Sequence, residues 1–193
     1  MRKDKNIEFE LISRIKEGDT SNFKILVEQY KGVSFSLACS ILKNEQDAED
    51  ALQEAFIKAF TGLGRFNFKS SFSTWFYKIV VNTCKTKYVK HKQNEQLIDQ
   101  DSDLTTEITD HQTPLSEIDI KERKEIINQI IDNLKTDESL LLRLFYLAEM
   151  SIDEIKDITG FKESKIKVTL LRARKSFQQK LEQNYGFEIQ FSS

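Results

Sequence analysis

One group of side chains that could do chemistry consists of acids in a helical stretch beginning near residue 47. Glu49, Asp50, Gln53 and Glu54 recur at spacings that place them along the outward side of an α-helix. Paired carboxylates of this kind could act as general acid and base or hold a metal ion. An exposed helical face, however, offers neither the burial nor the cleft that would shift their pKa values. These acids therefore indicate a solvated face that could dock on a partner, rather than a catalytic centre.

A second group combines aromatic rings with positive charge between residues 65 and 92. This segment has seven Lys or Arg residues and no acidic residue, although the net charge of the whole chain is −2. Part of the aromatic set fits a buried helical stripe, but Phe66 and Phe68 fall in a short loop with Arg65 and Lys69. Exposed rings can stack on unpaired bases while cations follow the phosphate backbone. The segment therefore predicts a surface for single-stranded nucleic acid.

A third group lies near the C-terminal end, where seven basic residues and one acid occur between residues 162 and 180. Ser151 and Glu154 have the spacing of a capping box, and Gly160 suits a left-handed helix end. A second helix follows from about Glu163, which completes a helix-turn-helix whose second helix would enter the major groove of duplex DNA. The outward side of that helix carries cationic, small polar and apolar groups: Ser164, Lys165, Lys167, Val168, Leu171, Arg172 and Lys175.

The remaining reactive side chains argue against several other classes. Cys39 and Cys84 are far apart in the sequence and the two histidines are not clustered, so we expect two reduced, largely buried thiols. For the same reason we expect no metal site and no cofactor. No apolar run approaches the ~20 residues that span a bilayer, and the first residues lack a hydrophobic signal region. These features predict a cytoplasmic protein without membrane insertion.

The elements that position these groups are expected to be helices. Apolar residues recur at three and four, no stretch alternates with period two, and the chain has one proline and six glycines. Residues 96–120 contain seven acids and no Lys or Arg, among scattered apolar residues, which is typical of a flexible linker. The prediction is an all-α fold of two small helical domains joined by a flexible acidic linker. Its parts are a first domain at 1–94, the linker at 95–120, a helix-turn-helix domain at 121–184 and a tail at 185–193.

Four ordered blocks of the sequence resemble one protein family. They are Phe23, Leu26 and Tyr30; DAEDALQEAFIKAF at 47–60; FSTWFYKIVVNT at 72–83; and KIKVTLLRARKSF at 165–177. In order, in spacing and in the variable linker between them, they resemble the extracytoplasmic-function (ECF) sigma factors, the smallest branch of the main bacterial sigma family. The resemblance implies an initiation subunit, not an enzyme, that joins RNA polymerase core. Such a subunit recognises the minus-ten and minus-thirty-five promoter elements and promotes strand opening.

The resemblance also implies residue roles, by position. Asp47, Asp50, Gln53 and Glu54 would dock on the core enzyme. The melted minus-ten element would be held by Arg65, Phe66, Phe68, Lys69, Ser71, Asn82, Lys85, Lys87 and Tyr88. The minus-thirty-five element would be read by Ser164, Lys165, Lys167, Val168, Leu171, Arg172 and Lys175. The implied partners are RNA polymerase core, promoter DNA as duplex and melted strand, and an anti-sigma factor, because this branch is often held inactive by one.

Two other classes stay open from the residues alone. A free-standing helix-turn-helix regulator would bind duplex DNA tightly without polymerase, whereas a sigma factor would bind weakly until core is present. A metal-dependent nucleic-acid hydrolase would use the acidic cluster and lose activity on Asp50→Asn. The lack of a buried, convergent set of acids argues against the hydrolase.

Overall fold

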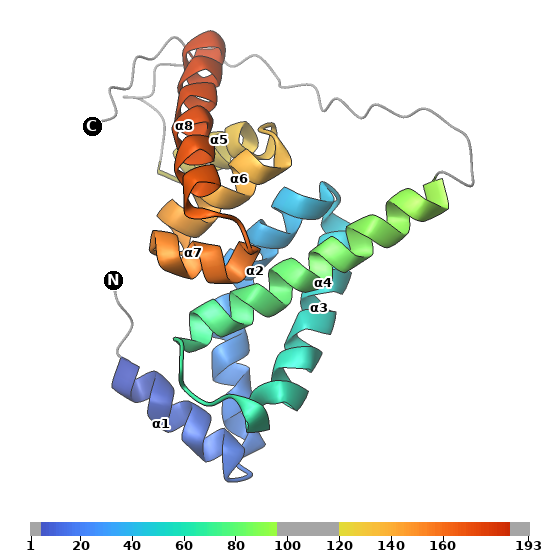
Figure 1. The fold of residues 1–193 in the computed structure, drawn as a ribbon, viewed down its shortest axis with the longest axis vertical. Helices are drawn as coiled ribbons and strands as arrows, with labels where there is room; N and C mark the ends of the chain where they lie inside the picture. Colours follow the sequence, from blue (N-terminus) through green and yellow to red (C-terminus); the bar gives the residue numbers. More distant parts are fainter. Residues whose placement is uncertain (1–4, 96–119, 186–193) are drawn as a thin grey trace.

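The computed structural model describes residues 5–95 and 120–185, which form eight α-helices and no strand (Figure 1). This architecture confirms the all-α prediction. Helices α1–α4 make up what we call the N-terminal lobe, and α5–α8 make up the C-terminal lobe. Apart from their end residues, the predicted acidic linker and C-terminal tail lie outside the described residues.

The N-terminal lobe is a helical bundle in which three long helices pack against one another and α1 lies at one end. Lys43 ends the second helix in a left-handed conformation (φ 56°), and Asn44 then caps the third by accepting a hydrogen bond from Asp47 N at 3.0 Å. The face that the third helix turns inward is rich in fully buried alanines, which let its neighbours approach closely. The helices are α1 Lys5–Lys16, α2 Phe23–Leu42, α3 Glu45–Gly62 and α4 Phe72–Glu95.

The C-terminal lobe contains the predicted helix-turn-helix. Ser151 Oγ accepts a hydrogen bond from Glu154 N at 3.3 Å, and Glu154 Oε2 accepts one from Ser151 N at 2.9 Å, so both halves of the capping box form. Gly160 ends that helix at φ 74°, a conformation that costs glycine little. The elements are α5 Ile120–Asp132, α6 Thr136–Leu142, the π-helical segment η3 Arg143–Leu147, α7 Ile152–Thr159 and α8 Glu163–Tyr185.

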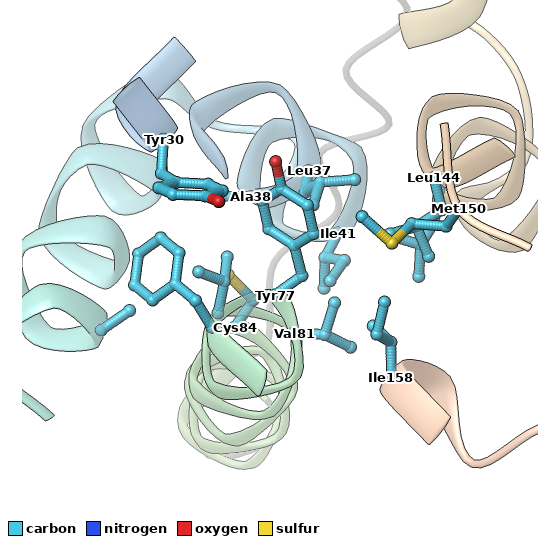
Figure 2. Close-up of a cluster of buried hydrophobic side chains, with 14 of the residues drawn as sticks. Tyr30, Leu37, Ala38, Ile41, Tyr77, Val81, Cys84, Leu144, Met150 and Ile158 are labelled. Carbon is cyan, nitrogen blue, oxygen red and sulfur yellow. The ribbon is translucent and has the colours of Figure 1, made fainter. Parts of the chain in front are cut away.

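The two lobes share one continuous hydrophobic core. Helix α7 packs along α4, and α6 packs against α2. Figure 2 shows side chains from both lobes meeting in this core: Leu37, Ile41 and Val81 of the N-terminal lobe, and Leu144, Met150 and Ile158 of the C-terminal lobe. All six are buried, so the contact excludes water as a protein interior does.

Polar contacts border this shared core on several sides. Ser139 Oγ donates a buried hydrogen bond to Ser40 Oγ at 2.9 Å. Lys43 Nζ donates to the backbone carbonyls of Asp132 and Leu134 at 2.6 and 3.1 Å. Because these bonds join α2 to the region of α5 and α6, they fix how the lobes are oriented as well as holding them together.

The two cysteines are free thiols in the N-terminal lobe. Cys84 is buried and Cys39 is half-buried, which matches the predicted burial fully for the first and partly for the second. Burial raises the pKa of Cys39 to about 11 and that of Cys84 to about 12, so neither side chain is a thiolate near neutral pH.

None of the helices that the structure describes combines the length and apolar character needed to cross a bilayer.

Candidate nucleic-acid interfaces

The acidic face of α3 lies on the surface but is not free of partners. Asp50 and Gln53 are exposed, whereas Asp47 and Glu54 are half-buried. Asp50 lies 3.8 Å from Lys87 of α4, and Asp47 lies 3.6 Å from His91 Nε2. Glu54 pairs with Lys58 at 2.7 Å, and the hydrogen bond from that lysine lowers the pKa of the carboxyl group. The acidic face is therefore partly ordered by contacts with basic side chains.

The acids do not converge on a metal site. Across residues 5–95 and 120–185, no group of three or more His, Cys, Asp or Glu side chains is arranged to hold a metal ion. The carboxylates of α3 instead point to solvent or to single cations, which gives the hydrolase alternative no structural support in the described part of the chain.

The loop between α3 and α4 separates its two phenylalanines. Phe66 is only 4% exposed. The centroid of its ring lies 5.0 Å from that of Trp75 and 4.9 Å from that of Phe68. Phe68 is 37% exposed and adopts a left-handed backbone conformation (φ 59°), which is uncommon for a bulky residue. Arg65 and Lys69 on either side are exposed. Phe68 is therefore presented outward, and Phe66 supports it from the core.

Ser71 plays a structural part at the end of this loop. Its hydroxyl accepts a hydrogen bond from Thr74 N at 3.2 Å, and its backbone carbonyl accepts one from Trp75 N at 3.1 Å. Ser71 therefore caps the start of α4 and fixes where the loop ends.

The predicted contact residues on α4 do not form one uniform exposed surface. Asn82 and Tyr88 are exposed, and Lys92 Nζ lies 5.3 Å from the Tyr88 ring centroid. Lys87 is half-buried beside Asp50. Lys85 is half-buried against the C-terminal lobe, where its Nζ donates to the Thr159 carbonyl at 2.8 Å. Nothing in the local sequence of α4 indicates that Lys85 meets α7, because that contact is between lobes.

Helix α8 has a clear inward and outward division. Ile166, Leu170, Ala173 and Leu181 are buried, and Phe177 on the same side is half-buried, as the apolar period of this helix predicts. The predicted outward side is exposed to solvent, and Leu171 is 67% exposed. The exposed residues on it are Ser164, Lys165, Lys167, Val168, Leu171, Arg172 and Lys175. The sequence therefore placed these seven residues on the correct side of the helix.

A groove runs between the start of α6 and the first turns of α8. It encloses about 670 Å³ and includes Ser164, Lys165, Val168 and Arg172 of the predicted outward side. Lys135 and Asp137 form the opposite wall. Sequence reasoning missed these two residues because the groove is made by two helices that are separated in the chain.

The turn of the helix-turn-helix brings together two lysines for which the resemblance implies different DNA elements. Lys165 Nζ lies 3.5 Å from the Phe161 ring centroid and 2.8 Å from Asp137 Oδ2. Lys85 Nζ, from the other lobe, lies 5.2 Å from the same centroid. Burial lowers the pKa of Lys85, and Asp137 partly offsets this effect. Phe161 thus connects the two basic surfaces, a role that its place in a turn did not reveal.

These features define an all-α, DNA-binding class of protein with a helix-turn-helix and a second basic surface. Two family models match the chain: Sigma-70 region 2 over residues 26–94 and Sigma-70 region 4 over residues 124–177. The ECF RNA polymerase sigma-E factor of Haemophilus influenzae is 30% identical over 178 residues, which are 89% of this chain and 94% of that protein. The ECF RNA polymerase sigma factor SigW of Bacillus subtilis is 28% identical over 88% of this chain and 94% of its own.

Solved structures share the fold. CnrH in complex with the cytosolic domain of CnrY gives a TM-score of 0.61 at 18% identity and covers 90% of this chain and 96% of its own. The sigma factor RpoE in complex with the anti-sigma factor NepR from Bartonella quintana gives 0.67 at 21% identity, with 83% and 97% covered. This chain belongs to the ECF sigma factors of RNA polymerase. It is therefore a transcription initiation factor and not an enzyme.

Proposed function

We propose that this sigma factor contacts promoter DNA through two surfaces, with α8 reading the minus-thirty-five element as duplex. The observation that carries the proposal is the two-sided character of α8, whose apolar side is buried in the core and whose cationic side is exposed, directly after a helix closed by a capping box and Gly160. Arg172 is exposed on that side, and an arginine can bond a guanine edge through two hydrogen bonds. Lys175 and Lys167 would contact phosphates.

The minus-ten element would be held as separated strand by the loop before α4 and by α4 itself. Phe68 offers an exposed ring on which a base can stack, and Arg65 and Lys69 flank it with positive charge. Asn82, Lys87 and Tyr88 would follow along α4. The energy for opening would come from binding, because each aromatic stack can return about 1–3 kcal/mol against a few kcal/mol for unstacking a base.

RNA polymerase core would dock on the acidic face of α3. Asp50 and Gln53 are exposed there, and the low pKa of Glu54 keeps its charge. The proposal places the protein in the cytoplasm, with core and promoter DNA. An anti-sigma factor is a further proposed partner, since the similar RpoE was solved bound to one.

Binding both promoter elements at once requires the two lobes to move apart. Lys85 and Lys165 contact the same ring, so their nitrogens are less than about 9 Å apart. Elements 25 base pairs apart are separated by about 85 Å along B-form DNA at about 3.4 Å per pair. Labels on Thr61→Cys and Gln179→Cys, both exposed, should lose energy transfer when core and promoter are added. Unchanged transfer in a transcribing complex would contradict this step.

The docking proposal is tested by reversing one charge on α3. Asp50→Lys should weaken association with purified core at least tenfold and lower promoter-directed RNA synthesis, while Glu125→Lys, the same change at an exposed site on α5, should leave both unchanged. Equal affinity of both variants for core would remove Asp50 from the interface. Tight promoter binding without core would instead favour the free-standing regulator.

A further inference from the structure

Helix α1 lies beside the loop that connects α3 to α4 (Figure 1). Phe9, Ser13 and Lys16 are spaced by four and three residues, so they share one side of α1. Lys16 Nζ donates a hydrogen bond to the Phe66 carbonyl at 2.9 Å and lies 5.3 Å from the Phe68 ring centroid. This side of α1 therefore braces the loop from which Phe68 projects.

Phe9 extends the exposed aromatic surface of that loop. Its ring centroid lies 4.6 Å from that of Phe68, at an interplanar angle of 46°. Phe9 remains 54% exposed despite this contact. The energy of burying a phenylalanine would favour covering both rings, so a contiguous pair left in solvent is a candidate ligand surface. Residues 5–16 lie outside the region matched by the region 2 family model, which starts at residue 26.

The charges around the two rings favour a polyanion over an apolar protein partner. Lys16, Arg65 and Lys69 contribute positive charge from α1 and the loop. Of the two acids of α1, Glu10 pairs with Arg14 at 2.6 Å, and Glu8 accepts a hydrogen bond from the Tyr30 hydroxyl. Rings that stack on a base, next to cations that contact its phosphate, are what unpaired DNA requires.

We infer that Phe9 and Phe68 together form the surface on which an unpaired base of the melted promoter strand stacks, and that Lys16 positions the loop for this contact. The inference rests on the proposed minus-ten function and assigns part of that site to α1. It makes α1 a DNA-binding element as well as a packing element. Because stacking needs only a π-face, the site accepts any base, and sequence preference must come from other residues.

The test uses the full chain bound to core polymerase. The probe is a 12-nucleotide single strand that the wild-type complex selects from a random pool, with one of its bases replaced by 2-aminopurine. Phe9→Ala should weaken binding of this strand about 5- to 150-fold, the range that one lost base stack represents. Phe9→Tyr should retain binding, whereas Phe9→Leu, which keeps apolar bulk, should bind like Phe9→Ala. Ile7→Ala is the matched control, because Ile7 is on the same helix and 65% exposed.

A second set of variants separates positioning from packing. Lys16→Ala should weaken strand binding and Lys16→Arg should restore most of it, with no change in binding of a minus-thirty-five duplex. If Phe9→Leu and Phe9→Ala bind the strand like wild type, the stacking assignment is wrong, although core association and transcription would still stand. If Phe9→Ala lowers strand binding, duplex binding and unfolding temperature together, the ring only supports the fold and the inference is also overturned. Loss of core association by the wild-type chain would instead contradict the proposed function itself.

Discussion

The two candidate DNA surfaces differ in how the fold presents them. On α8 the predicted reading residues are exposed, and the helix is held by its own lobe through Ile166, Leu170 and Ala173. On α4 the predicted residues are divided between solvent, the acidic face of α3 and the opposite lobe, which holds Lys85 through the Thr159 carbonyl. The proposed minus-thirty-five surface is therefore exposed on one lobe, while part of the proposed minus-ten surface is used for contact between lobes.

The proposed ligands of the two surfaces would account for this difference. Duplex DNA offers a groove of fixed shape, so a rigid helix with one free side is sufficient. The two promoter strands must be separated before one of them can be held. A surface that forms fully only after the lobes move apart would not bind a strand before that step. The contrast depends on α7 staying packed against α4, and each prediction below tests one side of it.

The largest expected effect is on stability and concerns the packing of α7 in the shared core. Ile158 is 1% exposed and lies in the core that both lobes share (Figure 2). Ile158→Ala should lower the free energy of unfolding by about 2–5 kcal/mol, because it removes buried methyl groups and leaves a cavity. Urea unfolding followed by circular dichroism measures this loss.

The same experiment shows whether the lobes unfold together. Leu171→Ala, at an exposed position on α8, should change stability by less than about 0.5 kcal/mol and serves as the control. A single transition that shifts as a whole for Ile158→Ala would support one cooperative unit. Two transitions, of which only one shifts, would show that the shared core does not couple the lobes.

The next largest effect concerns base recognition by the exposed surface. Arg172→Ala should weaken binding to the preferred duplex by about 1–3 kcal/mol and abolish discrimination at one base pair. Lys167, which pairs with Glu163 at 2.6 Å, should contribute only backbone attraction, so Lys167→Ala should weaken all sequences equally. Binding to a library of duplexes by the complex with core separates these outcomes. Equal loss on every sequence for Arg172→Ala would reassign it to phosphate contact.

The sequence predicted those parts of the site that depend on local chemistry. Ser151, Glu154 and Gly160 act on neighbours within a few residues, so their spacing predicted the turn. The helical period of Ile166, Leu170 and Ala173 predicted which side of α8 faces outward. The positions of Phe66 and Lys85 could not be predicted in the same way. The Phe66 ring packs against Phe72 and Trp75 of α4, its carbonyl accepts a hydrogen bond from Lys16 of α1, and Lys85 is held by α7. Periodicity within one helix carries no information about such contacts between elements.

A pH prediction tests the core beneath the downstream surface. Burial raises the pKa values of Tyr30 and Tyr77 above the ordinary value of about 10. Both tyrosines stay protonated in the folded state while they ionise in the unfolded state. Their contribution to the free energy of unfolding is therefore complete below pH 10 and is lost as the pH rises above it. Stability should fall by up to about 1.4 kcal/mol per pH unit for each tyrosine. Cys39 and Cys84, whose pKa values burial also raises, add to the slope in this range. Tyr77→Phe should therefore remove only the part that Tyr77 contributes, up to about 1.4 kcal/mol per pH unit, as measured by urea unfolding between pH 9 and 11. An unchanged slope would show that Tyr77 ionises equally in both states.

The smallest expected effect is at the contact where the two surfaces meet. Lys85→Met keeps the aliphatic stem but removes the hydrogen bond to the Thr159 carbonyl, which should lower the free energy of unfolding by about 0.5–1.5 kcal/mol. The net loss should be smaller than this, because the variant also removes the desolvation of the ammonium group that lowers the pKa of Lys85. Phe161→Leu removes the ring that Lys85 and Lys165 share. In a double-mutant cycle the two changes should couple by about 0.5–1 kcal/mol.

If Lys85 serves both as lobe contact and as DNA ligand, Lys85→Met should loosen the lobes and still weaken minus-ten binding. Stronger strand binding by Lys85→Met would show that this lysine only restrains the lobes, so that α4 binds DNA without it.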